Sequence, residues 1–129
     1  MFSSCTDLTK SKKIVIKDAY FYLPLGDSQI VAAYLSIKNK KDSVVTLDKI
    51  ICPLAERASF HETTYSEEGK VFMKHLQNIS LEPHTTLDFK PGSKHIMIEG
   101  INKQLQLGDQ FNCKLHTNIS TLEILFEVK

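Results

Sequence analysis

Several residue types that are typical of particular classes of protein are scarce or missing in this chain. Its 129 residues include no tryptophan, three cysteines and three methionines. No apolar run approaches the roughly 20 residues that a membrane-spanning helix needs. Sixteen basic and fifteen acidic residues give a formal net charge of +1, which argues against nucleic acid or an anionic membrane as the main partner. With 42% hydrophobic and 24% charged residues, the composition is that of one ordinary globular domain.

The three cysteines, Cys5, Cys52 and Cys113, do not form a disulfide framework, and no two of them stand in a C-x-x-C pair. Alternation places Cys113 on the same apolar face as Phe111 and Leu115. A free cysteine behaves there as a small hydrophobic residue, and this is the favoured interpretation. Cysteine usage therefore leaves the cellular compartment undecided.

Residues 1–12 are expected to form a flexible N-terminal tail, followed by a single β domain over residues 13–129. The first residues lack the basic region and long apolar stretch of a secretory signal. We therefore expect that a leader has been removed. The Phe-Ser-Ser-Cys segment ending at Cys5 loosely resembles a lipoprotein attachment site, which suggests a lipid anchor. An ordinary free cysteine in a flexible tail is the alternative.

The periodicity of the chain is that of β-strands almost throughout. Apolar and polar residues alternate over residues 31–38 and 121–128, and strand-like runs cover residues 14–22 and 45–52. Turn signals separate the runs, at Gly26-Asp27, Asn39 to Asp42, Glu68-Gly69, Pro91-Gly92, Gly100 and Gly108-Asp109. Short strands at this spacing predict an all-β domain, either a β-sandwich or a Greek-key barrel.

Four residues suited to a soft metal form the main functional signal: His61, Met73, His95 and Met97. Thioether sulfur is a soft ligand and imidazole suits copper, so two histidines and two methionines point to Cu(I) rather than zinc or iron. On a strand, side chains at i and i+2 share a face, so His95 and Met97 project together and Ile96 faces the core. His61 and Met73 flank a turn, which permits two adjacent strands or loop ends to bring them together.

The same residues also have an ordinary structural interpretation. A methionine in a β domain usually fills the core, and a histidine usually lies at the surface or in a hydrogen bond. Under this interpretation the chain is a metal-free extracellular β-sandwich interaction module. The i, i+2 pairing of His95 with Met97 favours the metal site, because a core methionine would alternate with an exposed histidine.

The spacing of these residues resembles the motif of the periplasmic copper chaperones of the PCu(A)C family. In this chain ten residues separate His61-Glu62 from Met73, and twenty-one separate Met73 from His95-x-Met97. The segments Ala33 to Asn39, Pro91 to Met97 and Leu105 to Asp109 are also similar to the family's, so the resemblance covers roughly residues 14–128. The sequence departs from the family motif at two positions. Glu62 stands where the family frequently has a methionine, and Ser93 replaces a glycine.

This resemblance implies a cupredoxin-like β-barrel that binds one Cu(I) with His61, Met73, His95 and Met97. It also implies a periplasmic protein that delivers copper to cytochrome c oxidase, chiefly its dinuclear copper centre, or to another copper-receiving protein such as a second copper chaperone. We expect this protein to be a monomer. The sequence stops at Lys129 without the His- and Met-rich tail that some members of the family carry, so a second site, for Cu(II), is not expected.

Two metalloprotein alternatives use other residues. A blue-copper site needs a cysteine with two histidines and a weak axial methionine, and Cys113 to His116 only partly resembles such a loop. A zinc hydrolase would draw on His61, His75, His84 or His116 with Glu62 as base, but no H-E-x-x-H or other catalytic spacing is present. We therefore expect no enzyme.

Overall fold

The computed structural model describes residues 13–129, a domain of ten β-strands with no helix in that range. The strands are β1 (Ile14–Phe21), β2 (Ile30–Asn39), β3 (Val45–Ile51), β4 (Arg57–Tyr65), β5 (Val71–Leu76), β6 (Ile79–Leu81), β7 (Thr86–Phe89), β8 (Lys94–Glu99), β9 (Gln110–Thr117) and β10 (Thr121–Val128). The predicted all-β class is confirmed. The predicted tail of residues 1–12, with Cys5, lies outside the described residues. The described part of the chain contains no helix that is long and apolar enough to cross a membrane.

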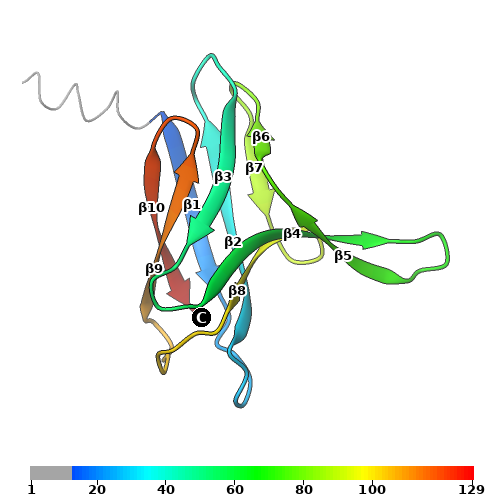
Figure 1. Ribbon diagram of the computed structural model, residues 1–129, viewed down its shortest axis with the longest axis vertical. Helices are drawn as coiled ribbons and strands as arrows, with labels where there is room; N and C mark the ends of the chain where they lie inside the picture. The colour runs from blue at the N-terminus through cyan, green and yellow to red at the C-terminus, as the bar shows by residue number, and fades with distance from the viewer. Residues whose placement is uncertain (1–12) are drawn as a thin grey trace, which may run out of the picture.

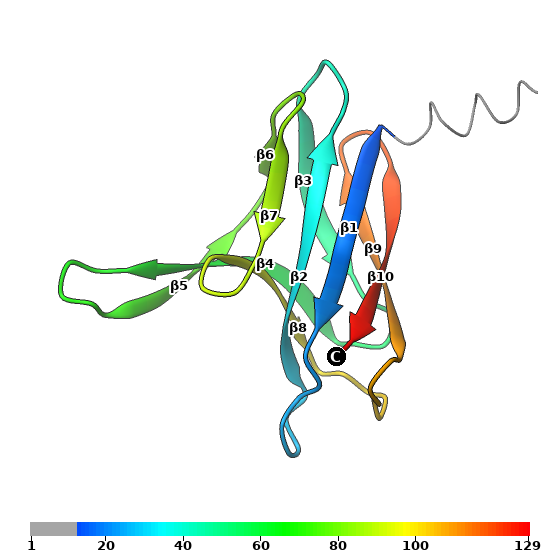
Figure 2. The same cartoon turned by 180° about the vertical axis from the view of Figure 1, so that it is seen from behind.

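The ten strands belong to one sheet that curls into a nearly closed barrel (Figures 1 and 2). The strand order is β5-β4-β8-β2-β1-β10-β9-β3-β6, and β7 pairs with β2 beside β8. Neighbouring strands are antiparallel except β1 and β10, which run parallel. This arrangement confirms the barrel-like architecture that the strand pattern predicted.

The core lies inside the barrel, where alternate side chains of each strand point inward. On β2, Ala33 and Ile37 are fully buried, as the alternation over residues 31–38 predicts. Three phenylalanines from β1, β9 and β10 pack together, with the Phe21 ring centroid 5.5 Å from that of Phe111 and 6.1 Å from that of Phe126. Burying a side chain of this size contributes about 1.5–3 kcal/mol, so the packing of these rings is a main source of the barrel's stability.

One buried polar residue fastens the end of β2 to a loop beside β6. Asn39 is fully buried, and its Nδ2 donates hydrogen bonds to the carbonyl oxygens of Ser43 at 2.9 Å and Leu81 at 3.0 Å. Its Oδ1 accepts a hydrogen bond of 2.9 Å from the backbone N–H of Lys41. A buried amide is tolerated because these partners satisfy both its donor and its acceptor groups.

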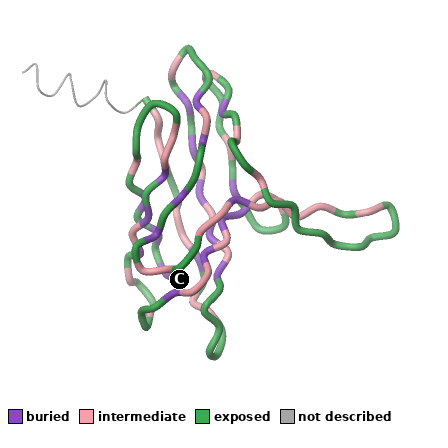
Figure 3. The backbone as a smooth tube through the Cα atoms, viewed as in Figure 1, coloured by how far each residue is buried: buried purple, intermediate pink, exposed green. Residues whose placement is uncertain are grey.

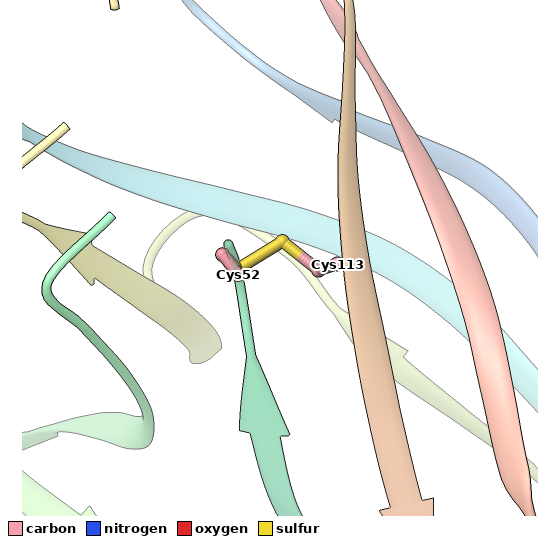
Figure 4. The surroundings of a disulfide bond; sticks show 2 residues. All are labelled: Cys52 and Cys113. Atoms are coloured by element: carbon pink, nitrogen blue, oxygen red, sulfur yellow. A yellow bond between two sulfur atoms is a disulfide. The ribbon is translucent and has the colours of Figure 1, made fainter. Parts of the chain in front are cut away.

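The favoured interpretation of Cys113 as a free cysteine is wrong, because Cys113 forms a disulfide with Cys52 (Figure 4). Both residues belong to the hydrophobic core, so the predicted apolar face is confirmed. Their pairing follows from strand register: Ile51 on β3 lies opposite Lys114 on β9, which brings the two cysteines to a Cα–Cα distance of 4.2 Å. This contact joins residues 61 positions apart and was not visible in the sequence spacing.

The β4–β5 hairpin projects sideways from the barrel (Figures 1 and 2). We call its outer part, residues 63–73, the arm. The arm consists of exposed and half-buried residues, whereas the buried residues concentrate on the barrel strands (Figure 3). At its base the backbone N–H of Thr63 donates a 3.1 Å hydrogen bond to the carbonyl of Ser93. The arm therefore has a fixed base and an outer end that makes few contacts with the core.

Candidate metal centre

Strand β4 lies between β8 on one side and β5 on the other, and this position assembles the candidate centre. His61 on β4 is directly opposite His95 on β8 and also directly opposite His75 on β5. The three histidines thus form one row across three strands. We call the side of the sheet that carries this row the histidine face.

Two of the four predicted ligands share strand β8 as the i, i+2 pattern predicts. Ile96 is 1% exposed and points into the core, so His95 and Met97 lie on the histidine face. Met97 is paired with Ser59, two residues along β4 from His61. Residues diagonal to each other on adjacent strands have Cα atoms about 7–8 Å apart, so His61, His95 and Met97 form a compact group.

Met73 lies on the same face but farther away, on the arm. It is paired with Thr63 and is 57% exposed. Met97 lies two strands across and four residues along from it, a separation of about 16 Å between Cα atoms in a flat sheet. The sheet register therefore brings three of the four predicted residues together. Met73 is diagonal to His61 across β4 and β5, as Met97 is across β4 and β8, so it can complete a four-ligand set when its side chain turns toward β8.

His61 and His95 each have one ring nitrogen that makes a hydrogen bond and one that makes none. The Nδ1 of His95 donates to the carbonyl oxygen of Ser93 at 3.3 Å, and its Nε2 is buried without a partner. The Nε2 of His61 is 2.8 Å from the Ser59 hydroxyl, and its Nδ1 is likewise buried without a partner. Leaving a buried polar group unpaired costs about 1–3 kcal/mol. A metal-ligating histidine commonly uses its second nitrogen for such an orienting hydrogen bond, so this pattern fits two metal ligands.

The environment of His61 keeps its ring neutral. Burial lowers the pKa of His61 below its ordinary value of 6.5, and the nearby His75 and His95 lower it further. Glu99 acts in the opposite direction and raises the pKa, with a smaller effect. Imidazole binds metal only when neutral, so His61 is in its ligating form at neutral pH.

His75 is the residue of this centre that sequence reasoning missed. Its ring stacks on that of His61, with centroids 5.2 Å apart and planes at 20°, and the His61 and His95 rings stack at 5.8 Å and 17°. A signal for it does exist in the sequence: Met73-x-His75 on one strand is the reverse of His95-x-Met97 on another. Among residues 13–129, no three His, Cys, Asp or Glu side chains already stand in a metal-holding arrangement, because the stacked rings do not yet converge.

The competing metal sites lack their ligands. Cys113 is bonded to Cys52 inside the core, so a blue-copper site that needs its thiolate is not available. Of the histidines considered for a zinc hydrolase, His84 is bound to Asp42 at 2.6 Å and His116 lies 3.2 Å from the Thr121 hydroxyl. Neither belongs to the histidine face. A surface hollow of about 590 Å³ lies between the β1–β2 and β8–β9 loops, and none of the candidate ligands lines it.

Fold and centre together define a cupredoxin-like β-barrel domain with a histidine- and methionine-bearing face. Residues 14–128 match the family described as "LpqE-like: Putative lipoprotein LpqE-like". The chain belongs to this family. No curated protein matches the sequence.

Solved structures agree with this assignment. The "Copper-bound PCuAC domain from PmoF2" superposes with a TM-score of 0.75 at 19% identity, over 91% of this chain and 92% of that one. The solution structure of "CuI-DR1885 from Deinococcus Radiodurans" gives a TM-score of 0.70 at 26% identity, over 89% and 76%. The predicted cupredoxin-like fold and the resemblance to the PCu(A)C family are confirmed.

Proposed function

We propose that this domain is a copper chaperone that holds one Cu(I) ion on the histidine face and delivers it to a copper-receiving protein. The observation that carries the proposal is the pair of adjacent histidines, His61 and His95, each with one hydrogen-bonded and one unpartnered ring nitrogen. Similarity to a copper-bound PCuAC domain and to Cu(I)-bound DR1885 supports the choice of metal.

The ligand set we propose is His61, His95, Met97 and Met73. Two neutral imidazoles and two thioethers add no charge to the ion, and soft thioether sulfur selects Cu(I). Thioethers cannot form disulfides, so they hold Cu(I) where thiols would oxidise. Their weakness is oxidation to the sulfoxide, to which the exposed Met73 is more open than Met97.

Release of copper is as important to a carrier as binding. We infer that Met73 is the ligand that leaves first, because it lies on the projecting arm and is more than half exposed. A receiving protein can then replace the ligands one at a time. Cytochrome c oxidase, through its dinuclear copper centre, is the recipient that the family resemblance favours. The domain uses no catalytic residues in this role.

An extracytoplasmic location, with the periplasm as the proposed compartment, agrees with two observations. The Cys52–Cys113 disulfide is of the kind that persists in oxidising compartments. The family description as a lipoprotein fits attachment outside the cytoplasm, and Cys5 is our candidate for the lipidated residue.

Anaerobic titration with Cu(I) against a competing chelator tests the proposed function. We expect the unmodified domain to take up one ion per chain, and the double variant Met73→Leu with Met97→Leu to lose that tight binding. Leucine keeps the volume and apolar character of methionine, so the fold should survive. His84→Gln is the matched control, because His84 contacts Asp42 away from the histidine face. No uptake by the unmodified domain would return the chain to a metal-free interaction module, and uptake unchanged in the double variant would exclude both methionines as ligands.

A further inference from the structure

The centre contains more nitrogen ligands than a Cu(I) site of two histidines and two methionines uses. Strand β5 carries Met73 and His75 on the histidine face, and strand β8 carries His95 and Met97 there. His61 lies between them on β4. The register puts the three imidazoles in one row and leaves the two methionines at opposite corners of it.

The row of imidazoles is continuous. The His61 ring lies 5.2 Å from the His75 ring and 5.8 Å from the His95 ring, measured between centroids. Adjacent strands are about 4.8 Å apart, so the outer two histidines have Cα atoms about 10 Å apart. Two of the three rings already present a buried, unpartnered nitrogen. The third, His75, is exposed on the edge strand β5, where its side chain has room to turn.

We propose that His75 joins His61 and His95 to form a second ligand set at this centre, one that holds Cu(II). This inference rests on the proposed function and extends it to the other oxidation state of the same metal. It departs from the expectation that the chain has no ligand set for Cu(II), because it uses the histidine face and not a His- and Met-rich tail. Imidazole nitrogen suits copper, and a site of nitrogen donors binds Cu(II) more tightly than the other divalent first-row metals. The three stacked rings must rotate to direct one nitrogen each at a common point. A copper ion bound there would be the partner that the buried Nδ1 of His61 and Nε2 of His95 lack.

The two ligand sets share His61 and His95 and differ in what β5 supplies. Met73 and His75 are two residues apart on that strand and point to the same side of the sheet. Met73 is diagonal to His61 and lies about 16 Å from Met97 between Cα atoms, whereas His75 lies directly opposite His61. The Cu(II) set therefore requires only that three neighbouring rings rotate, whereas the Cu(I) set must bring two methionines together from opposite corners of the row.

Two parallel titrations of the same variants test this inference. Cu(II) is titrated against a competing chelator with electron paramagnetic resonance as the second readout, and Cu(I) is titrated anaerobically. His75→Gln should weaken Cu(II) by about tenfold or more, as even the loss of an orienting partner does at metal sites, and should reduce the nitrogen couplings. Its Cu(I) affinity should be unchanged. Met73→Leu should show the reverse pattern, a weaker Cu(I) complex with Cu(II) unaffected.

The control variant is His116→Gln, which removes a histidine of β9 that contacts Thr121 and not the histidine face. Equal Cu(II) affinity and equal spectra for His75→Gln and His116→Gln would overturn the inference and leave the Cu(I) carrier intact. Conversely, an unmodified domain that binds Cu(II) through His75 but takes up no Cu(I) would remove the proposed carrier function and keep the three-histidine set. Thermal unfolding of each variant verifies that the fold is retained.

Discussion

Replacing Cys52 and Cys113 together by alanine removes a cross-link between residues 61 positions apart in the sequence. In the chain-entropy description, a closed loop of this length lowers the entropy of the unfolded chain by about 14 cal/mol/K, or about 4 kcal/mol at 25 °C. The substitution also removes two sulfur atoms from the hydrophobic core. The lost packing lowers the free energy of unfolding further. We therefore expect the free energy of unfolding to fall by about 4 kcal/mol or slightly more.

Urea unfolding followed by circular dichroism measures this change. For a domain of this size the loss corresponds to a midpoint lower by roughly 2 M. The reduced unmodified protein serves as a second reference, because it loses the cross-link and keeps the sulfur atoms. A loss below about 1 kcal/mol in both samples would refute the reasoning, since the bond would then contribute far less than its loop length implies. In the folded double variant Cu(I) uptake should be unchanged, because no cysteine belongs to the proposed centre.

Further predictions concern stability and its dependence on pH. Asn39→Ala should lower the free energy of unfolding by about 1–3 kcal/mol, because it leaves the buried carbonyl of Leu81 without its donor. Denaturant titration yields the value, and a change under about 0.5 kcal/mol contradicts it. The lowered pKa of His61 means that the unfolded metal-free chain binds a proton more readily than the folded one. The free energy of unfolding of the metal-free domain should therefore decrease as pH falls below about 6.5. The decrease should be less steep in His61→Gln. If the melting temperatures of the two proteins fell equally with pH, the reasoning would be contradicted. Gly100→Ala should reduce the melting temperature, because φ is +71° and the added Cβ would lie 2.6 Å from a side-chain carbon of Glu56; an unaltered melting temperature would show that the loop adapts.

Features that depend on local periodicity could be predicted from the sequence. The alternation over residues 31–38 identified the buried side of β2 because every second residue there faces the core. The same rule placed His95 and Met97 on one face and Ile96 in the interior. The turn between His61 and Met73 left open whether adjacent strands or loop ends bring them together, and the structure has adjacent strands, β4 and β5.

Features that depend on the register between strands could not be predicted. The disulfide requires Cys52 and Cys113 to meet across β3 and β9, and nothing local in either strand specifies that pairing. His75 was considered only for a zinc hydrolase, because its position opposite His61 follows from the hairpin register and not from its own surroundings. A shift of that register by one residue would have put His75 on the other face of the sheet.

X-ray absorption spectroscopy of the anaerobically prepared Cu(I) complex tests the ligand set most directly, because it reports the donor atoms around the metal. We predict a copper shell with both nitrogen and sulfur donors in the unmodified domain. One sulfur should disappear in Met97→Leu and one in Met73→Leu, while His116→Gln leaves the spectrum unchanged. A shell of nitrogen or oxygen donors alone, identical in all four proteins, would contradict the account, because neither methionine would then be a ligand of copper.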